Sequence, residues 1–235
     1  MRQLITTPLF SIMISLFTFE IGTILYNKTK IPILNPLLIS QTLIIIFLLR
    51  FHISFNTYNQ GGQYITFFLT PATVILAVPI YKKLRLLKEN ALPIFVGISV
   101  GSVCGIVSTL ILSRLFGLSR VIMDSMVAKS ITTPIGIEIS KQVGGIPAVT
   151  VAAIVLTGIV GSIIGPIIFK LLKINDRVAK GIALGTSSHA VGTAKAIEMG
   201  EVEGSMSGLS IGIAGIITVI IAPIIVKFIG PIIGG

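Results

Sequence analysis

Charged residues are scarce in this chain: Asp, Glu, Lys and Arg make up 11% of its 235 residues, whereas apolar types make up 53%. A soluble domain usually carries about 25% charged residues. So few charges cannot cover a surface that faces water, and the mean hydropathy of +1.02 indicates lipid as the solvent. No long polar stretch remains to form a second domain. Residues 1–235 are therefore expected to form a single transmembrane domain that crosses the bilayer several times.

Catalytic and metal-binding patterns are also missing. The single cysteine, Cys104, lies in an apolar run, so an intrachain disulfide is excluded and no Cys/His metal pattern exists. The chain has no Walker loop and no order of Ser, His and Asp typical of a hydrolase. We therefore expect no enzyme activity, no metal and no cofactor. The net charge of +10 comes from basic residues at the ends of apolar segments, which indicates membrane orientation and not a nucleic-acid partner.

Six apolar stretches are long enough, or nearly so, for the roughly 20 residues of one helical crossing. They are Leu4–Tyr26, Ile33–Leu49, Tyr64–Tyr81, Leu92–Leu115, Ile146–Phe169 and Met206–Phe228. Two further segments, Val121–Gly145 and Gly181–Gly204, are richer in Gly, Ser, Thr and Pro, and each directly precedes one of the last two stretches. The sequence thus predicts an all-α polytopic membrane protein with about six full spans and two discontinuous or re-entrant segments.

The basic residues predict an orientation in the inner (plasma) membrane. Lys82–Lys88 and Lys170–Lys180 are the densest basic loops, and with Lys28 and Lys30 they hold ten of the eighteen Lys and Arg residues. Cytoplasmic loops carry such an excess. We expect both dense loops to be cytoplasmic and the N-terminus to be external.

An internal echo lies near the C-terminus. The segment Gly158–Lys170 matches Gly215–Lys227 at a constant offset (215 − 158 = 57), and the matches include Gly, Pro and Lys as well as Ile. Chance similarity between two Ile-rich segments is one explanation. A duplicated unit, made of a broken segment followed by a full span, is the other. Internal repeats with discontinuous helices are a recurring plan of secondary transporters.

The first broken segment predicts a short helix. Thr132 and Thr133 precede Pro134, and Thr suits an N-cap while Pro suits the first helical position. A helix from Pro134 to about Gly144 has some ten residues, too few to span. Inside a membrane protein its start would direct unpaired N–H groups at whatever lies there, which favours anions. The alternative is an ordinary surface loop that leads into a capped helix.

The second broken segment, Gly181–Gly204, offers hydrogen-bond donors and small residues where a span would otherwise be. They are Thr186, Ser187, Ser188, His189, Gly192, Thr193 and Lys195. Ionisable residues within membrane segments indicate function. In the alternative interpretation, His189 satisfies a buried carbonyl, and Lys195 pairs with Glu198 or Glu138.

These motifs resemble those of the LrgB/CidB family of bacterial membrane proteins. The resemblance is carried by Phe68–Tyr81, Lys129–Pro134, Gly181–His189 and Gly192–Ala194. It implies an antiholin- or holin-like protein that modulates murein hydrolase activity and cell lysis, often with a smaller LrgA/CidA-type membrane partner. It also implies transport, since related proteins move pyruvate, glycolate and glycerate.

Two functional hypotheses follow. In the first, the chain transports small monocarboxylates, and the two broken segments form one cavity near the middle of the membrane. Its donors would be Thr132, Thr133, Ser187, Ser188 and backbone N–H groups, with Lys195 or protonated His189 balancing the charge. In the second, the chain is an antiholin- or holin-like regulator that acts by assembly. The expected partners are a carboxylate, the lipid bilayer and an LrgA/CidA-type protein, and the Gly-rich spans are compatible with a homodimer.

Overall fold

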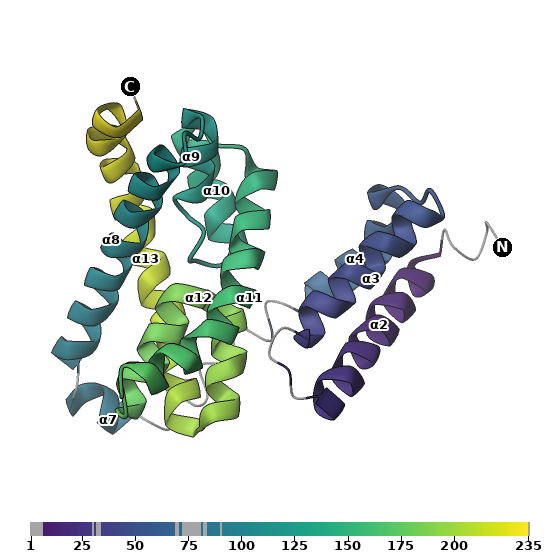
Figure 1. The fold of residues 1–235 in the computed structure, drawn as a ribbon, viewed down its shortest axis with the longest axis horizontal. Helices are drawn as coiled ribbons and strands as arrows, with labels where there is room; N and C mark the ends of the chain where they lie inside the picture. Colours follow the sequence, from purple (N-terminus) through teal and green to yellow (C-terminus); the bar gives the residue numbers. More distant parts are fainter. Residues whose placement is uncertain are drawn as a thin grey trace. The chain divides into compact units, whose positions relative to one another are not determined.

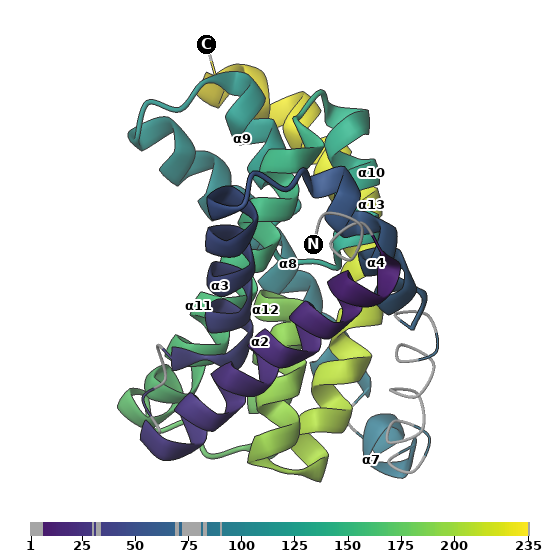
Figure 2. The same ribbon diagram turned by 90° about the vertical axis from the view of Figure 1, so that its right-hand side faces the viewer.

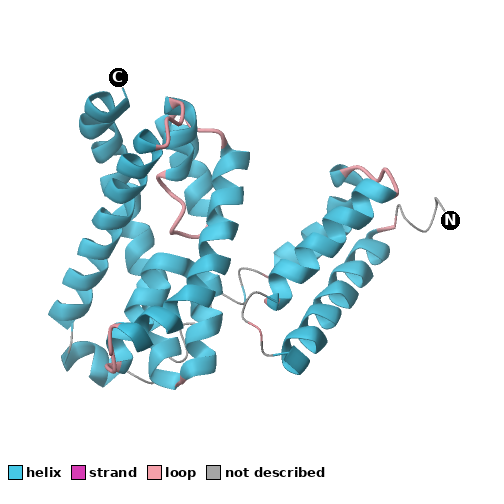
Figure 3. Cartoon of the chain, viewed as in Figure 1, coloured by secondary structure: helices cyan, strands magenta, loops and turns pink. Residues whose placement is uncertain are grey.

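The computed structural model describes residues 7–29, 31, 34–68, 71, 81, 84–89 and 91–234, and the regular structure of these residues is helical, as predicted (Figures 1 and 3). The chain divides into two compact units, Met1–Ile75 and Leu76–Gly235, which are described separately. That residues 1–235 form a single transmembrane domain stays a prediction.

Among its described residues the first unit contains three α-helices, α2 (Pro8–Thr29), α3 (Pro36–Arg50) and α4 (Phe55–Phe67). Hydroxyl groups link them: Thr18 Oγ1 lies 3.0 Å from Ser40 Oγ, and Ser15 Oγ lies 2.7 Å from Tyr58 Oη. Such pairs satisfy polar side chains that lipid could not.

The second unit contains seven described helices. They are α7 (Leu84–Glu89), α8 (Ala91–Leu115), α9 (Arg120–Met126), α10 (Thr133–Val143), α11 (Pro147–Leu171), α12 (Arg177–Met199) and α13 (Glu201–Gly234). In both views of the ribbon, the short helices α9 and α10 lie at one end of this unit and α12 lies toward the other (Figures 1 and 2).

Four described helices are long and apolar enough to cross a membrane: Pro8–Thr29, Ala91–Leu115, Pro147–Leu171 and Glu201–Phe228. They coincide with four of the six predicted apolar stretches. The second stretch forms α3, a helix of 15 residues that is shorter than a full crossing. Most of the third stretch, Tyr64–Tyr81, lies outside the described residues, so the number of spans stays a prediction.

Helix α10 has the predicted bounds. Thr132 is its N-cap, Pro134 lies in the first turn, and Gly144 ends the helix with a left-handed φ of 86°. Glycine adopts this conformation without the steric cost that a side chain brings. With 11 residues, α10 is too short to span a bilayer.

Helix α12 is broken at His189, where φ is 43° and ψ is −133°. The two halves fold back on one another: a Cβ placed on Gly192 would lie 2.5 Å from the Leu184 carbonyl oxygen, eight residues earlier. Leu184 and Ala196, from opposite halves, pack in one cluster with Phe169. The predicted discontinuity is therefore present, as a helical hairpin. Its depth in a bilayer stays a prediction.

Close packing of α12 on α13 generates a first prediction. A Cβ on Gly185 would meet the backbone of Ser207, with the Ser207 Cα only 2.9 Å away, whereas a Cβ on Gly212 would meet nothing within 4 Å. Overpacking of this kind costs about 1–3 kcal/mol. We expect Gly185→Ala to lower the temperature at which detergent-solubilised protein loses its monodisperse form, and the control Gly212→Ala to leave it unchanged. Equal midpoints for the two variants would contradict this packing.

Candidate functional site

A cavity of about 1120 Å³ lies inside the second unit. One wall is the face of α8 that carries Gly97, Gly101 and Gly105, and the others come from α11, from α12 and from the turn between α9 and α10. Most of the lining is apolar or glycine. The cavity is large enough for a small organic ion with some water.

Most of the polar residues in the lining come from the tips of the two broken segments, and Thr157 and Asp176 are the others. Lys129 and Ser130 lie in the turn between α9 and α10, and Thr186, Ser187 and Ser188 form the last turn of α12 before His189. Three residues of the predicted site, Thr186 to Ser188, thus line the cavity. It is the turn residues Lys129 and Ser130, and not Thr132 or Thr133, that face them from the first broken segment.

Two of these polar groups have no partner within the described part of the chain. The side chain of Thr186 is 8% exposed, and its Oγ1 accepts and donates no hydrogen bond. A buried hydroxyl without a partner costs about 1–3 kcal/mol. The half-buried Lys129 likewise makes no side-chain hydrogen bond or ion pair with any described residue. Among the described residues, neither group is therefore committed to a protein partner; Thr186 Oγ1 is itself buried, while Lys129 is half-buried.

The neighbouring serines are arranged differently. Ser187 Oγ donates to the Ala183 carbonyl oxygen at 2.7 Å and lies 3.0 Å from Ser188 Oγ. Ser188 is fully buried against Gly161 of α11, where a Cβ would collide with its hydroxyl. The serines therefore hold the tip of α12 against α11, and Ser187 remains exposed to the cavity.

His189 does not line the cavity. Its ring is 5% exposed, and Nε2 lies 2.9 Å from the Ile154 carbonyl oxygen of α11, a contact in which the Nε2–H tautomer donates. Thr193 Oγ1 donates to the His189 carbonyl oxygen at 3.0 Å and lies 2.7 Å from Ser207 Oγ. These bonds fix the reversal of α12. They match the alternative interpretation, in which His189 satisfies a buried carbonyl.

The remaining predicted residues also lie outside the lining. Lys195 pairs with Glu198 at 2.8 Å, and Glu138 pairs with Lys141 at 2.7 Å. The residues that do not line the cavity are Thr132, Thr133, Pro134, His189, Gly192, Thr193 and Lys195. The sequence analysis named Lys195 or protonated His189 as the counter-charge, but Lys129 is the basic residue that the structure places in the lining of the cavity.

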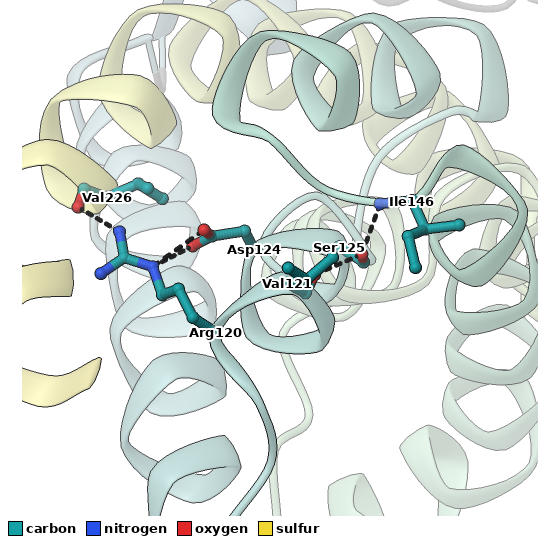
Figure 4. A network of polar contacts seen from close by, with 6 residues as sticks. All are labelled: Arg120, Val121, Asp124, Ser125, Ile146 and Val226. Atoms are coloured by element: carbon teal, nitrogen blue, oxygen red, sulfur yellow. Dashed lines mark hydrogen bonds and ion pairs between the residues drawn. The ribbon is translucent and has the colours of Figure 1, made fainter. Parts of the chain in front are cut away.

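A separate polar network anchors α9 to the rest of the unit (Figure 4). Arg120 Nε lies 2.8 Å from Asp124 Oδ2, and Arg120 Nη2 donates to the Val226 carbonyl oxygen of α13 at 3.2 Å. Ser125 Oγ accepts from Ile146 N at 2.7 Å. The buried carboxylate of Asp124 is thus paired, as burial requires. The network holds α9 to α13 and to the start of α11. Among the described residues, no group of three His, Cys, Asp or Glu side chains could hold a metal ion.

The strained conformation at His189 generates a second prediction. A positive φ of this kind, which glycine adopts freely, costs of order 1–3 kcal/mol for a residue with a side chain. His189→Ala loses the bond to Ile154 and keeps the strain, while His189→Gly loses the bond and relieves the strain. We expect both variants to melt below the wild type, and the alanine variant to melt below the glycine variant. A glycine variant no more stable than the alanine variant would show that His189 is not strained.

Comparisons with known proteins identify the family of the chain. Residues 15–228 match the model of the LrgB-like family. Proteins called "Antiholin-like protein LrgB" from Bacillus mycoides (strain KBAB4) and Bacillus cereus (strain B4264) are 39% identical to this chain over 225 residues, which cover 95% of it and 98% of each relative. No solved structure matches the chain. With its long apolar helices, the chain is a membrane-embedded protein and belongs to the LrgB family.

Proposed function

We propose that this protein transports small monocarboxylates, such as pyruvate, glycolate or glycerate, through the cavity of its second unit. The observation that carries the proposal is the cavity itself, which is lined by Lys129 and Thr186, two residues whose polar side-chain groups have no partner among the described residues. An unpaired lysine in a membrane protein is costly and indicates a site for an anion. Irregular backbone at membrane depth is stable only where it is buried in protein or lines a watery cavity.

The helix bounds support the duplicated unit that the sequence suggested. The N-caps Ser119 of α9 and Asp176 of α12 are separated by the same offset as the sequence echo (176 − 119 = 57). In the first repeat, the hairpin of α9 and α10 leads into the long helix α11. In the second repeat, the hairpin of α12 leads into the long helix α13. A hairpin returns to the side of the membrane on which it began, and the long helix then crosses the membrane. The second repeat therefore begins on the opposite side from the first. Inverted repeats of this kind characterise transporters that bind substrate where the two repeats meet.

A second candidate function comes from the relatives, which are named antiholin-like. In this function the chain regulates murein hydrolase activity and lysis, through a homodimer or together with an LrgA/CidA-type partner. The two functions are compatible, because the movement of carboxylates across the membrane changes the membrane energetics that control lysis.

Uptake into proteoliposomes tests the transport function. Purified protein should take up labelled pyruvate or glycolate with saturation. Thr186→Val should reduce uptake at low substrate concentration by about tenfold, which corresponds to the loss of one hydrogen bond to a charged group. The valine variant loses no protein–protein bond, so its melting temperature should equal or exceed that of the wild type. Thr23→Val is the control, since Thr23 does not line the cavity and its hydroxyl bonds within its own helix. Absence of uptake by wild-type protein would overturn transport and leave the antiholin-like function.

The orientation is tested separately. Both ribbon views place α7 and the α11–α12 connection at the same end of the second unit (Figures 1 and 2). That end carries Arg85, Lys88 and the basic residues of the connection, so we expect it to face the cytoplasm. After Cys104→Ser, a membrane-impermeant thiol reagent added to intact cells should label Phe116→Cys, at the opposite end, and leave Arg177→Cys unlabelled. The reverse pattern would show that the orientation is inverted.

A further inference from the structure

The offset of 57 residues recurs within the lining of the cavity. Three pairs of lining residues are equivalent positions of the two repeats: Met126 and Ala183 (183 − 126 = 57), Lys129 and Thr186 (186 − 129 = 57), and Ser130 and Ser187 (187 − 130 = 57). The sequence echo that gave the offset lies elsewhere, in α11 and α13. The lining is therefore independent evidence that the cavity lies where the repeats meet.

Equivalent positions that line one cavity face one another across the pseudo-symmetry axis of the repeats. A ligand on that axis contacts both members of a pair. Lys129 and Thr186 form the pair in which neither side chain has a described partner, and they supply an ammonium group and a hydroxyl. A carboxylate has two oxygens and can accept one hydrogen bond from each of these groups.

We propose that Lys129 binds the substrate carboxylate and restricts the cavity to anions with a single negative charge; this inference rests on the proposed transport function. Among the described residues that line the cavity, Lys129 and Asp176 are the charged ones. The Asp176 carboxylate already accepts from Ala179 N at 2.7 Å. The second carboxylate of a dicarboxylate would meet apolar and glycine walls or this like charge. Burial of an unpaired carboxylate is strongly unfavourable.

The test compares three variants in proteoliposomes, with glycolate and pyruvate as labelled substrates. Lys129→Gln removes the charge, and Lys129→Arg keeps it. Lys141→Gln is the matched control, because Lys141 lies on α10 and pairs with Glu138 outside the cavity. We expect Lys129→Gln to raise KM at least tenfold, Lys129→Arg to retain most of the affinity, and Lys141→Gln to behave as the wild type. Succinate and malonate should compete with glycolate at least tenfold more weakly than pyruvate does.

The outcomes separate this inference from the proposed function. If wild-type protein transports glycolate and Lys129→Gln keeps the wild-type KM, the inference is overturned and transport stands. A lower maximal rate with unchanged KM would equally overturn it, because that result indicates a structural role. Competition by succinate as strong as that by pyruvate would overturn the restriction to one charge. If the wild type transports neither monocarboxylate, transport itself is overturned, and this inference with it.

Discussion

The contact between the reversal of α12 and the glycine face of α11 is the constraint on which the second unit depends. His189 and Ser188 can approach α11 only because Gly158 and Gly161 leave room: a Cβ on Gly158 would lie 2.7 Å from the imidazole Cε1. The bond between Nε2 and the Ile154 carbonyl then holds a backbone conformation that is costly for histidine. This contact stabilises the reversal of α12, and the turn of α12 just before the reversal carries Thr186, which lines the cavity.

Hydrogen bonds between hydroxyl groups hold the other helices of the second unit together. In lipid, each hydroxyl or amide must find a partner inside the protein. Thr150 Oγ1 reaches Ser140 Oγ at 2.7 Å, and Thr193 reaches Ser207 at the same distance, so α10 and the second half of α12 are each held to a long helix. Thr150 and Ser207 are themselves equivalent positions (207 − 150 = 57). Among the described hydroxyls of this unit, Thr186 Oγ1 and Ser102 Oγ are buried without a partner, and of these two residues it is Thr186 that lines the cavity.

Much of this could be read from the sequence, because it depended on local signals. Thr132-Thr-Pro134 and Gly144 fixed both ends of α10, and the small polar residues around His189 located the break in α12. The sequence could not show which of the two lysines, Lys129 or Lys195, lines the cavity. Lys195 has Glu198 three residues away on the same helix and pairs locally, while Lys129 lies in a turn without an acidic neighbour. Which lysine faces a cavity depends on how the hairpins fold back, and sequence spacing does not contain that information.

The repeat explains why one histidine can be structural while the site stays polar. At the offset of 57 residues, His189 corresponds to Thr132, and both lie at the turn of their segment. The turn residue of each repeat therefore positions backbone, and the ligand-facing groups come just before it, at Lys129 and Ser130 in one repeat and at Thr186 and Ser187 in the other. Two copies of one scaffold thus present different chemistry to one cavity, a cation from one side and hydroxyls from both. A symmetric pair of lysines would repel each other and favour a dianion; a single lysine opposite a hydroxyl leaves charge balance to a single carboxylate.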